Sequence, residues 1–292
     1  MSEIIVRPLA TMDELRATEE IQRVTWSMND LDVIPAHALH AIQHNGAALL
    51  GAFDGEHLVG FSFAILATEN EPGRIDQVAA ARLKMYSVVT GVLPDYQRHN
   101  VGFQLKMAQR DFALRIGIRL ITWTYDPLES MNARFNIGKL GAVCRRYFRD
   151  FHGDMTGINA GLPTDRFEVE WWVTGNRVKN KAAQAWRPLK FDSLLAGGAL
   201  LINEAEHQAG SDWSVPPPNY VSRPSNLMLV EIPANFQAMK RENFALAHQW
   251  RMHTRELFEQ LFDSGFLVTD FVPHEDAQGH RRSFYLLTHQ DS

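Results

Sequence analysis

The chain contains a single cysteine, Cys144, among 292 residues. One thiol excludes an intrachain disulfide framework and gives no support to a cysteine-based zinc site. Cys144 could act as a nucleophile, but a lone cysteine is more often a small apolar core residue. The strand–turn–helix nucleophile elbow of serine hydrolases is also missing, so hydrolase chemistry gains no support.

Long hydrophobic runs and a strong charge of one sign are lacking too. The longest strongly apolar run, 194–202, is far too short to cross a bilayer. The first residues do not have the basic, apolar and cleavage regions of a signal peptide. The net charge is −5 and the pI about 6.2. We therefore expect a cytoplasmic protein that binds neither membranes nor nucleic acid.

The composition that is present is globular, with 45% apolar and 22% charged residues. The length suits two domains of ordinary size or one large domain. Glycines and turn residues gather in 152–165, and 209–224 contains the proline run 216–218. We place a boundary in the first segment and predict domains at 1–155 and 165–292, with the second segment as an extended connection.

Secondary-structure signals are clearest in the first half. Thr11 and Glu14 have the spacing of a capping box and predict a helix start, and Pro35 opens a second helix to about residue 44. Two apolar runs, 47–53 and 58–67, flank Asp54-Gly55, which predicts a β-hairpin. Residues 82–92 are rich in β-forming residues and predict the next strand.

A polar loop, Gln97 to Gly102, follows that strand and precedes an amphipathic helix that ends near Gly117. Such a joint directs backbone N–H groups and the positive end of a helix dipole at one point. It predicts a seat for a phosphate or pyrophosphate, and a plain strand–helix connection is the alternative.

The second half repeats part of this order. We predict a strand at 227–232, a long helix at 242–262, and strands at 266–272 and 283–288. The connection from Ile232 to Phe236 lacks the polar, glycine-containing loop. The predicted fold class is α+β with a mixed sheet.

Residues 4–150 resemble the GNAT superfamily of N-acyltransferases. The resemblance rests on the hairpin, the Gln97-x-x-Asn100-x-Gly102 loop and the segment from Asn132 to Gly141. Asn100 replaces the first glycine of the family loop, and asparagine tolerates left-handed backbone geometry. The resemblance implies a GNAT fold in the first half, and the second half is expected to be a degenerate second copy that shapes the acceptor pocket or a dimer.

The resemblance implies acetyl-CoA or succinyl-CoA as the acyl donor and no metal. It predicts pantetheine pairing at Val92 and Leu93, with Lys106 adding charge near the phosphates. The remaining cofactor contacts that it implies are Gln97, Arg98, His99, Asn100, Val101, Gly102, Phe103, Asn132 and Phe135.

Two departures concern proton chemistry. Ile137 stands where the family often has a tyrosine acid, and the strand 85–92 carries no carboxylate base. The catalytic candidates are Tyr86, Thr90 and Tyr125, with His99 as a further one. The expected reaction is direct attack of an amine on the thioester, and a non-catalytic acyl-CoA sensor or scaffold is the alternative.

The acceptor is expected to be a small amine or amino acid. Arg146, in a cluster with Arg145 and Arg149, is the candidate seat for a carboxylate, and a solvated helix end is the alternative. The chain also resembles a GNAT branch associated with N-acylamino-acid racemases or o-succinylbenzoate synthases, which implies N-succinylation of amino acids.

Three further features each allow a functional and a structural interpretation. His37, His40 and His44 share one face of a predicted helix and could hold a metal, although exposed surface histidines are the commoner case. Asp126 could contact substrate or form a turn with Pro127. Trp171 and Trp172 could line a substrate site or pack in a core.

Overall fold

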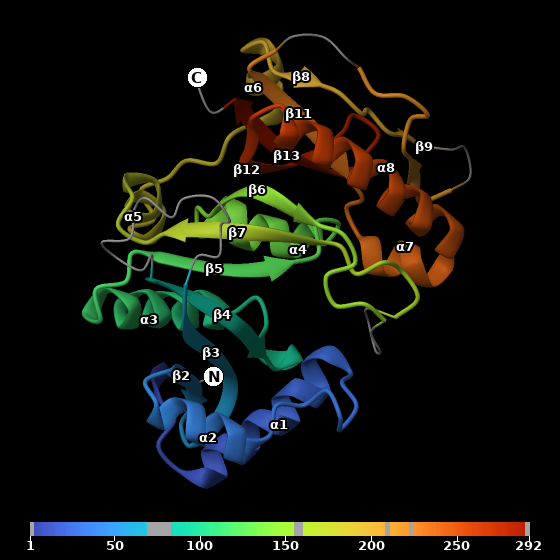
Figure 1. Cartoon of the computed structure of the whole chain (residues 1–292). Coiled ribbons are helices and arrows are strands. Elements are labelled where there is room, and N and C mark those ends of the chain that lie inside the picture. The colour runs from blue at the N-terminus through green and yellow to red at the C-terminus, as the bar shows by residue number, and fades with distance from the viewer. Residues whose placement is uncertain (1–2, 69–82, 155–159, 208–210, 222–224, 290–292) are drawn as a thin grey trace. The chain divides into compact units, whose positions relative to one another are not determined.

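A computed structural model describes residues 3–68, 83–154, 160–207, 211–221 and 225–289. The chain forms two compact units (Figure 1). Unit 1 comprises Met1–Trp123, Thr156–Ala160 and Trp172–Gly175, and unit 2 comprises Thr124–Met155, Gly161–Trp171 and Asn176–Ser292. The functional division at 1–155 and 165–292 stays a prediction. None of the described helices is both long and apolar enough to cross a membrane.

Unit 1 is a sheet with helices on both faces. Its strands run in the order β1-β2-β3-β4-β5, and only the β4–β5 pair is parallel. The strands are β1 (Ile4–Pro8), β2 (Ala48–Asp54), β3 (His57–Thr68), β4 (Leu83–Val92) and β5 (Leu120–Tyr125), of which β5 belongs to unit 1 through Trp123. The helices are α1 (Met12–Trp26), α2 (Ala36–His44), a 3₁₀ turn (Pro94–Tyr96) and α3 (Val101–Arg115).

Alternation along β2 assigns the two faces. Leu49 packs in a cluster with Leu15 of α1 and Leu39 of α2, whereas its neighbour Leu50 packs with Leu105 of α3. Successive strand side chains point to opposite faces, so α1 and α2 cover one face and α3 covers the other. The start of α3 is thereby fixed against the sheet beside the end of β4.

Two local predictions for unit 1 are confirmed. Thr11 and Glu14 form both halves of the capping box at α1. Asp54 pairs with His57 across a turn in which Gly55 has φ 61°, as the hairpin required. The predicted strand 82–92 is β4 from Leu83, and its first residue lies outside the described residues.

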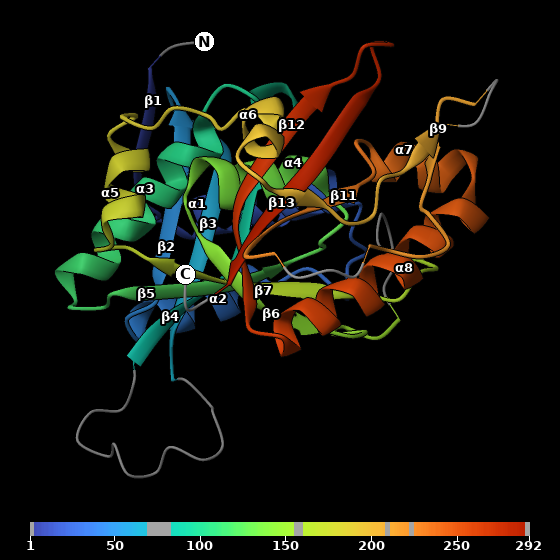
Figure 2. The ribbon, with the colours of Figure 1, turned by 90° about the horizontal axis from the view of Figure 1, so that it is seen from above.

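The strands assigned mainly to unit 2 run in the order β7-β6-β12-β13-β11-β8. Figure 2 shows the long antiparallel hairpin of β12 and β13 and helix α8. The strands are β6 (Val143–Phe148), β7 (Arg166–Trp172), β8 (Leu200–Leu201), β11 (Leu227–Ile232), β12 (Phe266–Glu275) and β13 (Arg281–His289), with a separate ribbon of β9 (Glu206–His207) and β10 (Ser214–Val215). The helices are α4 (Ser130–Ala133), a π-helical segment (Arg134–Lys139), α5 (Asn176–Ala182), α6 (Phe191–Ala196), α7 (Phe236–Glu242) and α8 (Phe244–Asp263).

Neighbouring residues of β13 again separate two faces. Tyr285 packs edge-to-face against Phe258 of α8 at 5.5 Å between ring centroids. Phe284 stacks on Phe191 of α6 at 4.5 Å. The fold class predicted from the sequence, α+β with a mixed sheet, is confirmed.

Two predictions in unit 2 need correction. Residues 145–149 do not form a helix end, because 143–148 are strand β6 paired with β7. The predicted helix 242–262 begins at Phe244, because Asn243 accepts a hydrogen bond from the Leu246 N–H at 3.0 Å and caps α8 there. The preceding residues form the separate helix α7.

Candidate functional site

The second half of strand β4 is not paired with strand β5. The parallel register joins Met85 to Ile121 and Tyr86 to Thr122, and it extends no further among the described residues of the two strands. On its other side β4 stays paired with β3 as far as Val92. The second half of β4 therefore offers backbone N–H and C=O groups along one edge, which is where an extended chain containing amides can add by β-type pairing.

A compact turn carries the chain from this edge to α3. The Leu93 N–H donates to the Val59 carbonyl at 2.9 Å, and the Gln97 N–H donates to the Pro94 carbonyl at 3.1 Å. The Gln97 side chain reaches back to the Val92 carbonyl at 3.0 Å, and the Tyr96 hydroxyl donates to Asp54 at 3.0 Å. These bonds hold the loop in place before any ligand binds.

The loop itself adopts alternating left-handed backbone torsions. Arg98 has φ 65° and Asn100 has φ 67°, and Gln97 to Asn100 are exposed. A left-handed residue beside right-handed ones turns successive N–H groups toward one concave side and makes an anion-binding nest. Asn100 is the N-cap residue of α3, and its side chain makes no capping hydrogen bond. The left-handed conformation expected of Asn100 is confirmed.

Two buried side chains hold the first turn of α3 against the rest of unit 1. Val101 and Phe103 are buried, while Gly102 between them is partly exposed. The first N–H groups of a helix have no partner within the helix and carry the positive end of its dipole. The exposed loop Gln97–Asn100 and this helix start together form what we call the anion loop.

Lys106 does not contribute charge to the anion loop, contrary to the sequence-based expectation. Its side chain is buried, and its ammonium donates to Ser87 at 2.8 Å and to Gln109 at 3.2 Å. It also lies 3.9 Å from the ring centroid of Trp123. Burial lowers the pKa of Lys106 to about 7. Arg98 and His99 are exposed in the loop and remain the cationic candidates.

The catalytic candidates of unit 1 lie on β4. Tyr86 is partly exposed. The hydroxyl of Thr90 lies 3.0 Å from that of Ser62 on the paired strand, and Ser62 in turn accepts from Gln109 at 2.9 Å. Thr90 thus ends a buried polar chain that begins at Lys106.

Tyr125, the third catalytic candidate, belongs to unit 2. Its hydroxyl lies 3.0 Å from that of Tyr285, which donates to the Pro127 carbonyl at 2.8 Å. Burial raises the pKa of Tyr125, so this phenol stays protonated. The hydroxyl contact of Tyr125 with Tyr285 therefore has a structural role.

Asn132 lies in α4 and Phe135 in the π-helical segment that follows it. Asn132 is exposed and Phe135 is partly exposed, whereas Ile137 is completely buried. The widened turn shows in the Leu140 N–H, which donates to the Phe135 carbonyl at 2.9 Å. Such π-turns are frequent at functional sites, and sequence periodicity does not reveal them.

The arginine cluster is neutralised by separate carboxylates. Arg146 donates to Glu168 at 3.0 Å, Arg145 donates to Glu170 at 3.2 Å, and Arg149 makes a two-bond pair with Glu259. Arg146 and Glu168 are directly opposed in the β6–β7 register. The role of Arg146 in holding a substrate carboxylate stays a prediction, and it requires this ion pair to open.

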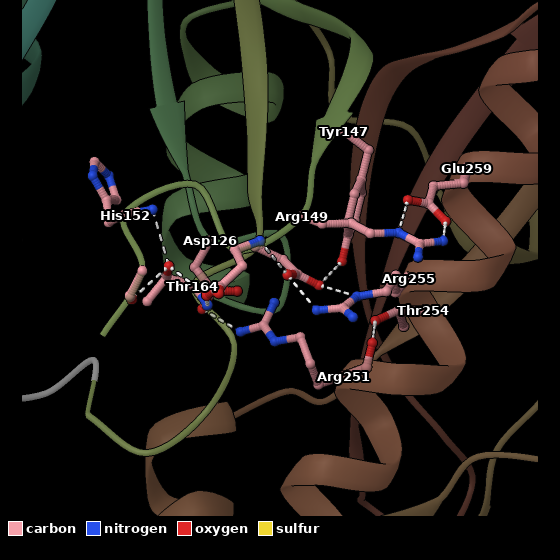
Figure 3. Close-up of polar contacts among 12 residues, drawn as sticks. Asp126, Tyr147, Arg149, His152, Thr164, Arg251, Thr254, Arg255 and Glu259 are labelled. Atoms are coloured by element: carbon pink, nitrogen blue, oxygen red, sulfur yellow. Dashed lines mark hydrogen bonds and ion pairs between the residues drawn. The ribbon is translucent and has the colours of Figure 1, made fainter. Parts of the chain in front are cut away.

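Figure 3 shows a polar cluster in unit 2 that the sequence did not reveal. Asp165 accepts two bonds from Arg255, at 2.8 and 2.7 Å, and one from the Tyr147 hydroxyl at 2.6 Å. Arg251, from the adjacent turn of α8, donates to Asp126 at 2.5 Å. Its Nε and Nη1 atoms are buried and have no hydrogen-bond partner in the described part of the chain.

Both carboxylate oxygens of Asp126 accept hydrogen bonds within unit 2. One carboxylate oxygen accepts from Arg251, and the other accepts from the Leu128 N–H at 2.9 Å. This favours the turn over a substrate contact. Nearby Glu129 accepts from Gln237 at 2.6 Å, and burial, with the charge of Asp126, raises its pKa to about 7. A carboxyl group with that pKa is a candidate acid or base that sequence spacing could not single out.

The cysteine, the tryptophan pair and the three histidines of α2 differ in their surroundings. Cys144 is completely buried and burial raises its pKa, so it is not a reactive thiol. Trp171 is buried and donates to the Leu140 carbonyl at 2.9 Å, whereas Trp172 is exposed. His37, His40 and His44 lie on α2 but do not bring their ligand atoms to metal-binding distance.

Neither a family model nor a curated protein matches the chain. Solved structures that it resembles include the ribosomal-protein-S18-alanine N-acetyltransferase of Escherichia coli, at 13% identity and TM-score 0.44, covering 59% of this chain and 96% of that one. An N-acetyltransferase of Staphylococcus aureus Mu50 matches at 13% identity and TM-score 0.46, covering 59% and 100%. At this level of likeness, activity has to be argued from the residues of the site.

Proposed function

We propose that this chain is an acyl-CoA-dependent N-acyltransferase that acts on the amine of a small molecule. The observation that carries the proposal is the continuity of two features in unit 1. The unpaired edge of β4 suits an extended arm with amide groups, and the anion loop follows it directly. The pantetheine arm of CoA has two amides and ends in a pyrophosphate, so one molecule matches both features in order.

The expected reaction is direct attack of the neutral amine on the thioester. Backbone groups near Val92 and Leu93 would hold the arm, and the N–H groups from Gln97 to Phe103 would hold the pyrophosphate. The amine proton has to leave, and the departing thiolate needs a proton. Tyr86 and Thr90 are the candidates within unit 1 for these proton transfers.

The donor is acetyl-CoA or succinyl-CoA, and an amino acid is the proposed acceptor. Arg146 would hold a substrate carboxylate after release from Glu168. The proposal extends to the second half, where the order β11-α7-α8-β12-β13 is that of a degenerate second copy. We propose that this half shapes the acceptor site, that the chain acts in the cytoplasm, and that a homodimer forms through it.

A non-catalytic acyl-CoA sensor is the second candidate. The hydroxyl groups of Thr90 and Tyr125 are each bonded to another side chain, and this occupancy favours binding without proton transfer.

One assay separates the two candidates. The protein is incubated with acetyl-CoA or succinyl-CoA and a panel of amino acids and small amines, while calorimetry follows binding and a chromogenic disulfide reagent follows thiol release. Amine-dependent thiol release supports the transferase. Tight binding without turnover across the panel supports the sensor. Failure of both thioesters and of free CoA to bind would reject both candidates.

Arg146 is tested in the same assay with Arg146→Ala and with Arg145→Ala as the matched control. Arg145 pairs with Glu170 as Arg146 pairs with Glu168, so both variants lose one cross-strand ion pair. A loss of turnover that appears only for Arg146→Ala and only with acidic substrates supports the carboxylate seat. Equal effects on neutral and acidic substrates would count against it.

A further inference from the structure

Unit 2 brings together three side chains that sequence spacing did not connect. His207 lies on β9, and Asp276 and His280 lie on the turn between β12 and β13. One ligand atom from each residue lies within 4.8 Å of the others. Among the residues that the structure describes, these three side chains form the one group of histidine, cysteine or carboxylate ligands close enough together to hold a metal ion.

The turn presents Asp276 and His280 in a fixed arrangement. One carboxylate oxygen of Asp276 accepts from the backbone N–H groups of Gln278 at 3.0 Å and His280 at 2.9 Å. Gly279, with φ 85°, permits the tight return. The second oxygen, Oδ2, is directed at the His280 ring and lies 3.1 Å from its Nδ1 atom. Adjacent ligands of a tetrahedral zinc ion with bonds of about 2.0 Å are about 3.3 Å apart, so this pair is already at coordinating distance.

His207 completes the set from a different strand. Its ring stacks on that of His280 with centroids 3.8 Å apart and planes 14° from parallel. The Nδ1 atom of His207 is buried and has no hydrogen-bond partner among the described residues. A buried ring nitrogen without a partner is costly in an ordinary protein environment, and a metal ion would satisfy it.

The charges around the three side chains suit a divalent cation. Arg282 is the nearby cation that opposes a metal, but it is paired with Glu231 at 2.5 Å and with Glu204 at 3.5 Å. The Asp276 carboxylate supplies the negative charge that a divalent ion needs.

We propose that His207, Asp276 and His280 bind one divalent transition-metal ion, with Zn²⁺ as the best match to two imidazoles and one carboxylate. The fourth position is open to water. The ion would fasten the β9–β10 ribbon to the β12–β13 turn, two segments about 70 residues apart in the sequence. This site is independent of the anion loop and of the proposed transferase activity.

The test uses the full-length protein, freed of metals with a chelator and titrated with Zn²⁺ against a competing chromophoric chelator. One equivalent of zinc is expected to bind and to raise the melting temperature. His207→Ala and His280→Ala are each expected to weaken binding by about 100-fold, since even loss of an outer-sphere partner of a metal ligand costs 10–100-fold. His40→Ala, which removes an exposed histidine of α2, is the matched control and should leave binding unchanged.

Folding is controlled separately. Asp276→Asn keeps a carbonyl oxygen for the two backbone N–H groups and removes only the charged ligand, so the turn should persist while zinc affinity falls. Circular dichroism in chelator should be the same for all variants. Cobalt substitution should give tetrahedral absorption bands that His280→Ala abolishes. Zinc affinity equal in the unaltered protein and in the His207→Ala/His280→Ala double variant would overturn the site.

Discussion

Two strand-to-helix joints, one in each unit, place an asparagine at the helix N-cap with opposite results. Asn100 caps α3 in unit 1, and Asn235 caps α7 in unit 2. Asn100 has φ 67° and its side chain makes no capping bond. Asn235 has φ −143° and its side chain accepts from the Ala238 N–H at 3.2 Å. The sequence offers an asparagine in both cases, and the backbone torsion decides whether the helix start is closed by its own cap.

The residues around the two joints also differ in how many of their polar groups are already hydrogen-bonded. In the joint before α7, the Ala234 carbonyl accepts from Ser130 at 2.6 Å, and Gln237 donates to Glu129. Those polar groups are occupied within unit 2. In the joint before α3, Gln97 to Asn100 are exposed and follow an unpaired strand edge. We infer that only the first joint is built to receive an anion, which agrees with the absence of a polar loop in the second.

The largest effect is expected from Gly102→Glu at the second position of α3. A carboxylate about 4 Å from a pyrophosphate charge costs about 4 kcal/mol at an effective dielectric constant of 20, or roughly a thousandfold in affinity. Calorimetry with CoA should therefore detect no binding. Ala238→Glu puts the same charge into the first turn of α7 and should leave CoA affinity unchanged. Equal losses in both variants would erase the distinction between the joints.

A second prediction concerns Lys106, the buried lysine of α3. The pKa of Lys106 is about 7 in the folded protein and near 10.5 in the unfolded chain. The unfolded state therefore binds more protons between these values, and the free energy of unfolding should rise with pH across pH 7–10 by about 4 kcal/mol. Lys106→Met should flatten this rise, whereas Lys179→Met, at an exposed position of α5, should not. Denaturant unfolding at several pH values measures both, and an unchanged slope in Lys106→Met would contradict the assignment.

Glu129, the partner of Gln237 in α7, should show the opposite pH dependence. Burial and the neighbouring Asp126 raise its pKa from 4.5 to about 7, so the folded state holds the extra proton between those values. Its contribution to stability is present below pH 4.5 and is lost as the pH rises toward 7. Glu129→Gln keeps a neutral side chain of the same shape and should remove this loss. The shift is smaller than that of Lys106, so a smaller total change in the free energy of unfolding is expected in the same series.

The smallest effects come from the two capping asparagines themselves. Asn235→Ala should cost about 1 kcal/mol, because a capping bond is lost. Asn100→Ala should cost about 1 kcal/mol for a different reason, since alanine is strained at positive φ. Glycine separates the causes: Asn100→Gly should restore or increase stability, and Asn235→Gly should not. The same response of both sites to glycine would show that their torsions do not differ as described.

Local sequence signals located most of the elements and the anion loop. The capping box at Thr11, the Asp54-Gly55 turn and the loop from Gln97 to Gly102 act over a few residues, so their consequences are visible without the fold. The role of Lys106 was mistaken, because its helical position alone did not reveal that its side chain points toward Ser87 and the sheet. The sequence did not predict strand β6, because its two arginines resemble a solvated surface until Glu168 and Glu170 are found paired with them.

By itself the sequence determined that the chain is an α+β protein with a polar joint between its fourth strand and the following helix, because periodicity and turn chemistry are short-range properties. Only the tertiary structure decided which groups remain available. Burial removes Lys106 and Cys144 from contact with solvent and ligands, and an ion pair with Glu168 occupies Arg146. Folding also brings His207 close to Asp276 and His280, which lie about 70 residues further along the chain. Desolvation and long-range contact depend on what packs around a residue, and the order of residues does not contain that information locally.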